Sequence, residues 1–416
     1  MVKIFIKTFI IFFLISSLSY GLSLKEAIKL AKENYPKLKS EEEKLMSVKF
    51  SYKSALFNFF PTLSYSFNYS KYNDINPLDY FSRTHSLTVN WVLFNNGKNI
   101  IQYKLGKINY LYQKENFKEE IINLVYEVKK AYFTATAKKE ILRYRKIQLK
   151  SAEVDYNLAL EKFKLGLVKK SDVLNAKVRY ENAKYLYIQS KADYQISLAE
   201  LNSLLGIPLE QKTEINEKIL YSYCGKNLES FDSLYNQFLK NRPIVKSLNY
   251  KKRLASLEKE KYIYSYSPTI SVFFQKNKVY NSLTGRDNYD MYGIRFDWLL
   301  FDGLGRYYNY IAAKYNELST KYQVRETLRK LKLNLFKRYI DYKRNLEKVN
   351  LAKEIIRQAE ENYKQTLGEY KVGKNDIVAL IKSEKSLADA QINLVNSVLN
   401  LVLTKIEIEK EIGKVD

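Results

Sequence analysis

Apolar and polar residues alternate most clearly in one short stretch, 61–70. Its apolar positions are Leu63, Tyr65, Phe67 and Tyr69, and threonine, serine or asparagine occupies each position between them. Because successive side chains of a strand point to opposite faces, one face of this stretch is aromatic and the other is small and polar. Taken alone, the pattern fits a strand of a soluble sandwich or a strand of a membrane barrel with a wet lumen.

Three further stretches alternate in the same way. The first, 86–93, completes a strand pair at about 62–93, around a polar loop that contains Asn73, Asp74, Asn76, Pro77 and Asp79. The other two form a second pair at about 269–301. There Arg295 and Asp297 oppose an apolar set, which favours a wet lumen over a dry sandwich core. The large residues predicted to face lipid are Tyr65, Phe67, Tyr69, Trp91, Phe274, Phe296 and Trp298.

The chain repeats itself at a constant offset of 207 residues. Both tryptophans and several helix-breaking residues fall into register: Pro36 with Pro243, Pro61 with Pro268, Trp91 with Trp298, Gly166 with Gly373, and Gly206 with Gly413. We therefore expect two copies of one unit, 22–206 and 231–416, joined by a connecting segment at 207–230.

Each copy combines short helices, a strand pair and a long helical hairpin. Helical patterns cover 24–34 and 38–60, and after the strands a far longer one runs from 99 to 165, with its counterpart at 305–372. A helix of that length reaches roughly 100 Å at 1.5 Å per residue. Glycine at each turn predicts hairpin tips near 166–174 and 373–381. The helical periodicity alone favours a coiled-coil rod, whereas the four strands favour a fold class that is mainly α with a membrane β-barrel portion.

The first 21 residues have the features of a secretory signal peptide. Lys3 and Lys7 precede an apolar run at 9–15, and small residues surround the expected cleavage point at Gly21. An uncleaved anchor is the alternative. No later run of 18 apolar residues occurs, so any membrane crossing falls to the strands. Four strands leave two open edges, which predicts oligomerisation, with dimer and trimer both open.

Charge and rare residues exclude several function classes. The net charge of +25 suggests a nucleic-acid binder, but the cations are spread along helices among glutamates and the signal directs export, so we expect no nucleic-acid partner. Cys224 has no second cysteine to pair with, and His85 is the only histidine. No carboxylate has a plausible base or metal partner. We therefore predict no enzymatic activity, no cofactor and no metal site.

Seven stretches give the chain a family likeness through their order, their spacing and the duplication of some of them in the second copy. Over its mature length the chain resembles the TolC family of outer-membrane efflux channels, in stretches 24–36, 60–64, 91–97, 163–174, 205–208, 298–303 and 370–373. The resemblance implies a homotrimer in the outer membrane, in contact with its lipid. Each chain would give four strands to a shared 12-stranded barrel, and the helices would form a periplasmic tunnel.

The resemblance also implies a function and partners. The chain would be the outer-membrane channel of a tripartite efflux or type I secretion system, a passive exit duct. Substrates would come from an inner-membrane pump of the RND, ABC or MFS type, through a periplasmic adaptor that contacts the hairpin tips. The rival interpretation is an exported coiled-coil structural or adhesin protein without a pore.

The tips carry the residues that the resemblance implicates in the entrance and in adaptor contact. Asp172 matches a first-tip aspartate and Tyr370 a second-tip tyrosine, so a hydrogen bond between them would hold the entrance closed. Asp172 is equally suited to capping a helix after the turn. Aspartates expected after Gly373 are replaced by Ala379 and Lys382, which argues against an acidic ring. The predicted tip residues are Gly166, Ser171, Asp172, Tyr370, Gly373, Asn375, a displaced charge at Asp376, and Lys382.

Overall fold

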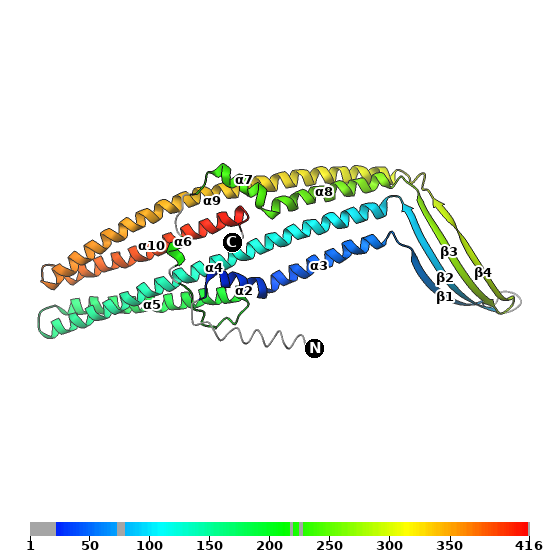
Figure 1. Ribbon diagram of the computed structural model, residues 1–416. Coiled ribbons are helices and arrows are strands. Elements are labelled where there is room, and N and C mark those ends of the chain that lie inside the picture. Colours follow the sequence, from blue (N-terminus) through cyan, green and yellow to red (C-terminus); the bar gives the residue numbers. More distant parts are fainter. Residues whose placement is uncertain (1–21, 73–79, 217–218, 224–227, 415–416) are drawn as a thin grey trace. The chain divides into compact units, whose positions relative to one another are not determined.

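The computed structural model describes residues 22–72, 80–216, 219–223 and 228–414 (Figure 1). The predicted signal peptide, the polar loop residues Asn73 to Asp79 and Cys224 lie outside the described residues. The chain forms two compact units. Unit 1 contains Met1–Ser40, Glu119–Arg242 and Leu331–Asp416, and unit 2 contains Glu41–Lys118 and Pro243–Lys330. Each unit draws on both copies of the repeat, because like elements of the two copies pack together.

Unit 2 holds one antiparallel sheet of four strands, in the order β1-β2-β3-β4 (Figure 1). The strands are β1 (Thr62–Tyr72), β2 (Tyr80–Asn95), β3 (Thr269–Asn281) and β4 (Gly285–Asp297). β2 pairs with β3, so the strand pairs of the two copies form one surface, while β1 and β4 are its edges. β2 begins earlier than its apolar alternation indicates, because residues from Tyr80 pair with β1 although polar and charged ones interrupt the pattern.

In both copies of the repeat, one helix precedes the strand pair in the sequence and a long helix follows it. α3 (Pro36–Phe57) precedes β1 and α8 (Pro243–Tyr264) precedes β3. Pro61 and Pro268 lie between helix and strand, where a fixed φ and a missing N–H favour the change of structure. The long helices α4 (Lys98–Lys164) and α9 (Gly305–Lys371) follow the strand pairs, and each has 67 residues.

Unit 1 is mainly helical in the residues that the structure describes, and one isolated parallel bridge joins Leu22 to Ile215. Besides most of α4 and α9 it contains α2 (Leu24–Asn34), α5 (Lys170–Leu205), α6 (Ile219–Tyr223), α7 (Phe231–Asn241) and α10 (Ile377–Glu411). Its core consists of side chains that are at most 1% exposed, among them Val128, Tyr132, Phe133, Leu201, Leu205, Phe238, Leu335 and Val402. Of the helices in these described ranges, none is both long and apolar enough to cross a membrane.

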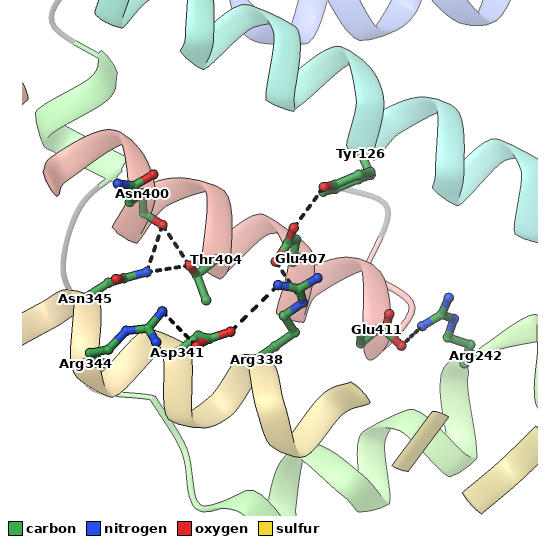
Figure 2. A network of polar contacts seen from close by, with 10 residues as sticks. All are labelled: Tyr126, Arg242, Arg338, Asp341, Arg344, Asn345, Asn400, Thr404, Glu407 and Glu411. Carbon is green, nitrogen blue, oxygen red and sulfur yellow. Dashed lines mark hydrogen bonds and ion pairs between the residues drawn. The ribbon is translucent and has the colours of Figure 1, made fainter. Parts of the chain in front are cut away.

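A polar network joins three helices of unit 1 (Figure 2). The Glu407 carboxylate on α10 accepts a hydrogen bond from the Tyr126 hydroxyl of α4 at 3.1 Å. Its second oxygen lies 3.0 Å from the Arg338 guanidinium of α9. Asn345 of α9 donates to the Thr404 hydroxyl of α10 at 2.8 Å. These contacts fix the rotation of the helices about their axes, which a uniform apolar core does not do.

Candidate functional site

The sheet has one exposed apolar face, which the strand register defines. Tyr65 lies opposite Leu87, and Val89 lies opposite Phe274, which in turn faces Tyr292. Facing residues on neighbouring strands share a face, so the predicted lipid-facing strand residues all lie on one side of the sheet. They are substantially exposed: Tyr65 64%, Phe67 51%, Tyr69 54%, Trp91 44%, Phe274 40% and Phe296 59%. Trp298 is 55% exposed and follows the end of β4.

The opposite face of the sheet is polar. Gln275 donates hydrogen bonds to the Ser86 hydroxyl at 2.8 Å and to the Asn277 side-chain oxygen at 3.0 Å. Arg295 and Asp297 are on this face too, as the sequence pattern indicates. The Arg295 guanidinium lies 5.3 Å from the centre of the Phe273 ring. The sheet therefore separates an apolar surface from a hydrogen-bonding surface.

The two tryptophans occupy equivalent places in the two copies. The Trp91 indole N–H donates to the carbonyl oxygen of Phe59 at 2.9 Å, and that of Trp298 donates to the carbonyl oxygen of Tyr266 at 3.0 Å. Each ring thus has a satisfied polar group at the helix-proximal end of the apolar face. Such a residue suits the boundary between an apolar medium and water.

The two hairpin tips have the same backbone turn. Gly166 and Gly373 both adopt φ of 75°, a left-handed conformation that glycine reaches without steric cost. After Gly166 the Leu167 N–H donates to the Lys162 carbonyl at 2.9 Å, and after Gly373 the Lys374 N–H donates to Glu369 at 2.9 Å. These bonds close the last turns of α4 and α9.

At the first tip, Asp172 stabilises the start of a helix. Its carboxylate accepts the backbone N–H of Lys169 at 3.1 Å, three residues earlier, from the third position of α5. The neighbouring Ser171 is exposed. The structure therefore gives Asp172 a role in stabilising the start of α5. This role is close to the helix capping that was the alternative to a role in the gate.

At the second tip, polar side chains also serve the local turn. Asp376 is the N-cap of α10 and accepts the Ala379 N–H at 2.8 Å, while Asn375 donates to Glu369 at 3.0 Å. Hydrogen bonds from Gln365 and Asn375 lower the pKa of Glu369. Lys382 is exposed one turn further along α10. No group of acidic, histidine or cysteine side chains that could hold a metal ion occurs in the described residues.

Tyr370 is buried between the two hairpins of unit 1. It is 7% exposed and packs with Ile377 and Leu380 of α10, and the Lys162 ammonium of α4 lies 4.4 Å from the centre of its ring. Burial, with the charges of Asp155 and Asp172 in addition, raises the pKa of Tyr370. Within the described part of the chain, no hydrogen bond links Tyr370 to Asp172; its contacts here are the apolar cluster and the Lys162 cation.

A second contact between the hairpins was not anticipated from the sequence. Arg179 of α5 lies 2.6 Å from the Asp155 carboxylate of α4 and also forms an ion pair with Glu384 of α10. All three side chains are at most 15% exposed. Asp155 stands eleven residues before Gly166, and Glu384 stands eleven residues after Gly373. These equal distances from the repeated glycines are the one sequence signal that could have indicated Asp155 and Glu384 as partners of a shared cation.

Comparison with known proteins places this architecture. Residues 27–207 match the outer membrane efflux protein family. The alkaline protease secretion protein AprF of Pseudomonas aeruginosa is 23% identical over 305 residues, which are 68% of this chain and 62% of AprF. The chain thus spans less than two thirds of that curated relative.

Solved structures share the fold. The CmeC outer membrane channel of Campylobacter jejuni has a TM-score of 0.82 at 17% identity, covering 94% of this chain and 85% of CmeC. CusC has a TM-score of 0.81 at 14% identity, covering 95% of both chains. The fold is therefore that of the outer-membrane channels. The first copy of the repeat thus matches the outer membrane efflux protein family, and the likeness to TolC-type channels inferred from the sequence is confirmed.

Proposed function

We propose that this chain forms a trimeric outer-membrane channel, the passive exit duct of a tripartite efflux or type I secretion system. An inner-membrane pump would supply the energy, and a periplasmic adaptor would deliver substrate to the hairpin tips. The duct itself would catalyse no reaction and need no cofactor. AprF is named for secretion of a protease, and the family that residues 27–207 match is that of outer membrane efflux proteins, so each branch of the proposal has support.

One observation carries the proposal: the register of the sheet places its large apolar residues on one exposed face and its hydrogen-bonding residues on the other. In water, exposed rings such as Tyr65, Phe274 and Phe296 would leave a large apolar surface uncovered. In a bilayer the same face would be solvated by acyl chains, and the polar face would line a wet lumen.

The edges of the sheet support an oligomer. β1 and β4 each have a single partner, so one edge of each strand carries unpaired backbone N–H and C=O groups. Each such group left unpaired in hydrocarbon raises the free energy by roughly several kcal/mol. Joining the β4 edge of one copy to the β1 edge of the next removes every free edge, and three copies give a closed barrel of 12 strands.

The hairpin contacts of unit 1 support a gated entrance. Arg179 bridges Asp155 and Glu384, and Lys162 covers Tyr370, so both contacts tie the α4–α5 hairpin to the α9–α10 hairpin of the same chain. Releasing these contacts would let the second hairpin move away from the first. The same ends of the hairpins, including Ser171, Asn375 and Lys382, are where we place the adaptor.

The decisive experiment measures the mature protein extracted in detergent. Light scattering and negative-stain imaging should show a trimer with a hollow stem, and reconstitution into planar bilayers should give discrete conductance steps. A monomer or dimeric rod that stays soluble without detergent would contradict the channel and favour a coiled-coil structural protein or adhesin.

A further inference from the structure

Cations gather at one end of the exposed face of the sheet. The five basic strand residues that share this face are Lys71 of β1, Arg83 of β2, Lys276 and Lys278 of β3, and Arg286 of β4. All five are exposed. They lie in the half of the sheet near the turn Asn281–Gly285, away from the strand ends that connect to helices. We call these five residues the basic rim.

The other half of the same face carries no charge among the described strand residues. Its rows consist of Leu63, Val89, Phe274 and Tyr292, then Trp91, Val272 and Ile294, then Ile270 and Phe296. The face therefore changes from apolar to basic along the strands. In soluble proteins, lysines on edge strands prevent association between sheets. That role does not require the cations to be confined to one half of the face.

Aromatic rings are interleaved with the cations of the basic rim. The Arg83 guanidinium lies 5.0 Å from the centre of the Phe81 ring and 5.9 Å from that of Tyr69, both on the same face. Phe81 in turn packs against Tyr280 at 5.7 Å between ring centres. Contacts of this kind position a guanidinium beside aromatic rings while its N–H groups can still bind an anion.

The basic rim has little acidic compensation. Asp290 is the one acidic side chain that the described strand residues place on this face, and it lies 3.8 Å from Lys276, where both groups are about half exposed. Lys278 faces His85 and Asn288 across the sheet, and Arg286 faces Tyr280. The basic rim therefore carries an excess of exposed positive charge that an anion from outside the sheet can reach.

We infer that the basic rim binds the phosphate groups of membrane lipid headgroups, in the leaflet that surrounds the strand turns. The inference rests on the proposed function, because it requires the apolar half of the face to lie in acyl chains. A cation row that begins where the apolar rows end would meet the headgroup layer, where phosphate is the fixed anion. The interleaved rings suit the same layer.

The test uses full-length mature protein in detergent, titrated with diphosphoryl lipid A and, separately, with phosphatidylcholine, and observed by native mass spectrometry. The variant replaces four rim cations by glutamine: Arg83→Gln, Lys276→Gln, Lys278→Gln and Arg286→Gln. A matched control removes four exposed cations of α9 instead: Lys337→Gln, Lys348→Gln, Lys353→Gln and Lys364→Gln.

The wild-type protein and the control should prefer diphosphoryl lipid A, and the rim variant should bind it at least roughly tenfold more weakly. The preference should also weaken at high salt. Equal binding by all three proteins would overturn the inference. So would displacement of the lipid by inorganic phosphate at the same concentration, since that result would indicate a free-anion site.

Two half-variants guard against misfolding of the fourfold variant. Arg83→Gln with Arg286→Gln, and Lys276→Gln with Lys278→Gln, should each weaken lipid A binding by a smaller factor; no change in either would contradict the inference. A conducting trimer without phosphate preference would refute only the lipid site. A protein that neither forms a trimer nor conducts would refute the proposed function itself.

Discussion

Two arginines of unit 1 bridge carboxylates from different helices, yet they lie in different surroundings. Arg242, between α7 and α8, contacts Glu119 of α4 at 2.7 Å and Glu411 of α10, and its side chain is 5% exposed. Arg179 joins Asp155 and Glu384 nearer the tips, where the neighbouring apolar cluster contains only Tyr370, Ile377 and Leu380 among buried residues. The same chemistry therefore supports a packed core in one place and a small contact between hairpins in the other.

The proposed gated entrance requires one contact that can open and another that stays closed. Burial opposes the charge of Arg242, but the hydrogen bonds and charges of Glu119 and Glu411 outweigh it and raise the pKa of Arg242. Removing Arg242 would leave the Glu119 and Glu411 carboxylates, 12% and 16% exposed, without their cation in the packed core of unit 1. Removing Arg179 would leave Asp155 and Glu384, which are buried to a similar degree, without the side chain that ties the two hairpins together. We expect the first change to affect folding and the second to affect gating.

The largest effect should come from Arg242→Ala. Leaving Glu119 and Glu411 buried without their partner should lower the free energy of unfolding by about 3–5 kcal/mol. Chemical unfolding in detergent, followed by circular dichroism, measures it. The control is Arg253→Ala, since the exposed pair of Arg253 with Glu260 should contribute less than about 1 kcal/mol. A similar small change in both variants would contradict the comparison.

Arg179→Met should have a smaller effect on stability and a larger one on conductance. Asp155 and Glu384 would lose their bridge, weakening the closed arrangement by about 2 kcal/mol and raising the open fraction more than roughly tenfold. Single-channel recording measures the change, with Arg357→Met on the exposed part of α9 as control. The comparison would be contradicted if Arg179→Met left the conductance unchanged and lowered the free energy of unfolding as much as Arg242→Ala does.

Lys162 and Tyr370 sharpen the picture of the tip. Tyr370→Phe keeps the ring beneath the Lys162 ammonium, so conductance should stay at the wild-type level. Lys162→Gln removes the cation and should weaken the closed arrangement by about 0.5–1 kcal/mol. If Tyr370→Phe and Asp172→Asn instead both open the channel, a Tyr370–Asp172 hydrogen bond holds the entrance, as the family resemblance suggests.

The smallest effect concerns pH at the second tip. Hydrogen bonds from Gln365 and Asn375 lower the pKa of Glu369 below its ordinary 4.5. A lowered carboxyl pKa stabilises the folded turn above pH 4.5, and this contribution disappears as pH falls through the lowered value. Asn375→Ala should raise the pKa of Glu369 toward 4.5 in a carboxyl NMR titration, whereas Gln358→Ala, which alters the partner of Glu354, should not. An unmoved Glu369 titration in Asn375→Ala would show that this hydrogen bond is not formed.

Much of the fold was predictable because its signals are local or recur at the constant offset of the internal repeat. The alternation at Tyr65 and Phe67 needed only the two-residue period of a strand. The long helices needed only the absence of breakers between the strands and Gly166 or Gly373. Even the polar side of β4 was evident from Arg295 and Asp297. At the tips, by contrast, the family resemblance implied a Tyr370–Asp172 contact, whereas in the structure the Asp172 carboxylate accepts a hydrogen bond from the backbone N–H of Lys169 at the start of its own helix.

The sequence by itself determined the repeat, the strand faces and the glycine turns, because each depends on residues close together or at a constant spacing. Only the tertiary structure decided which charges meet. With 70 basic and 45 acidic residues, the chain offers many possible partners for Arg179 and Arg242, and local pattern cannot choose among them. Strand register likewise brought Arg83, Lys278 and Arg286 onto one rim. Contacts between residues far apart in the sequence depend on how the elements pack, and the local hydrophobic period contains no information about that packing.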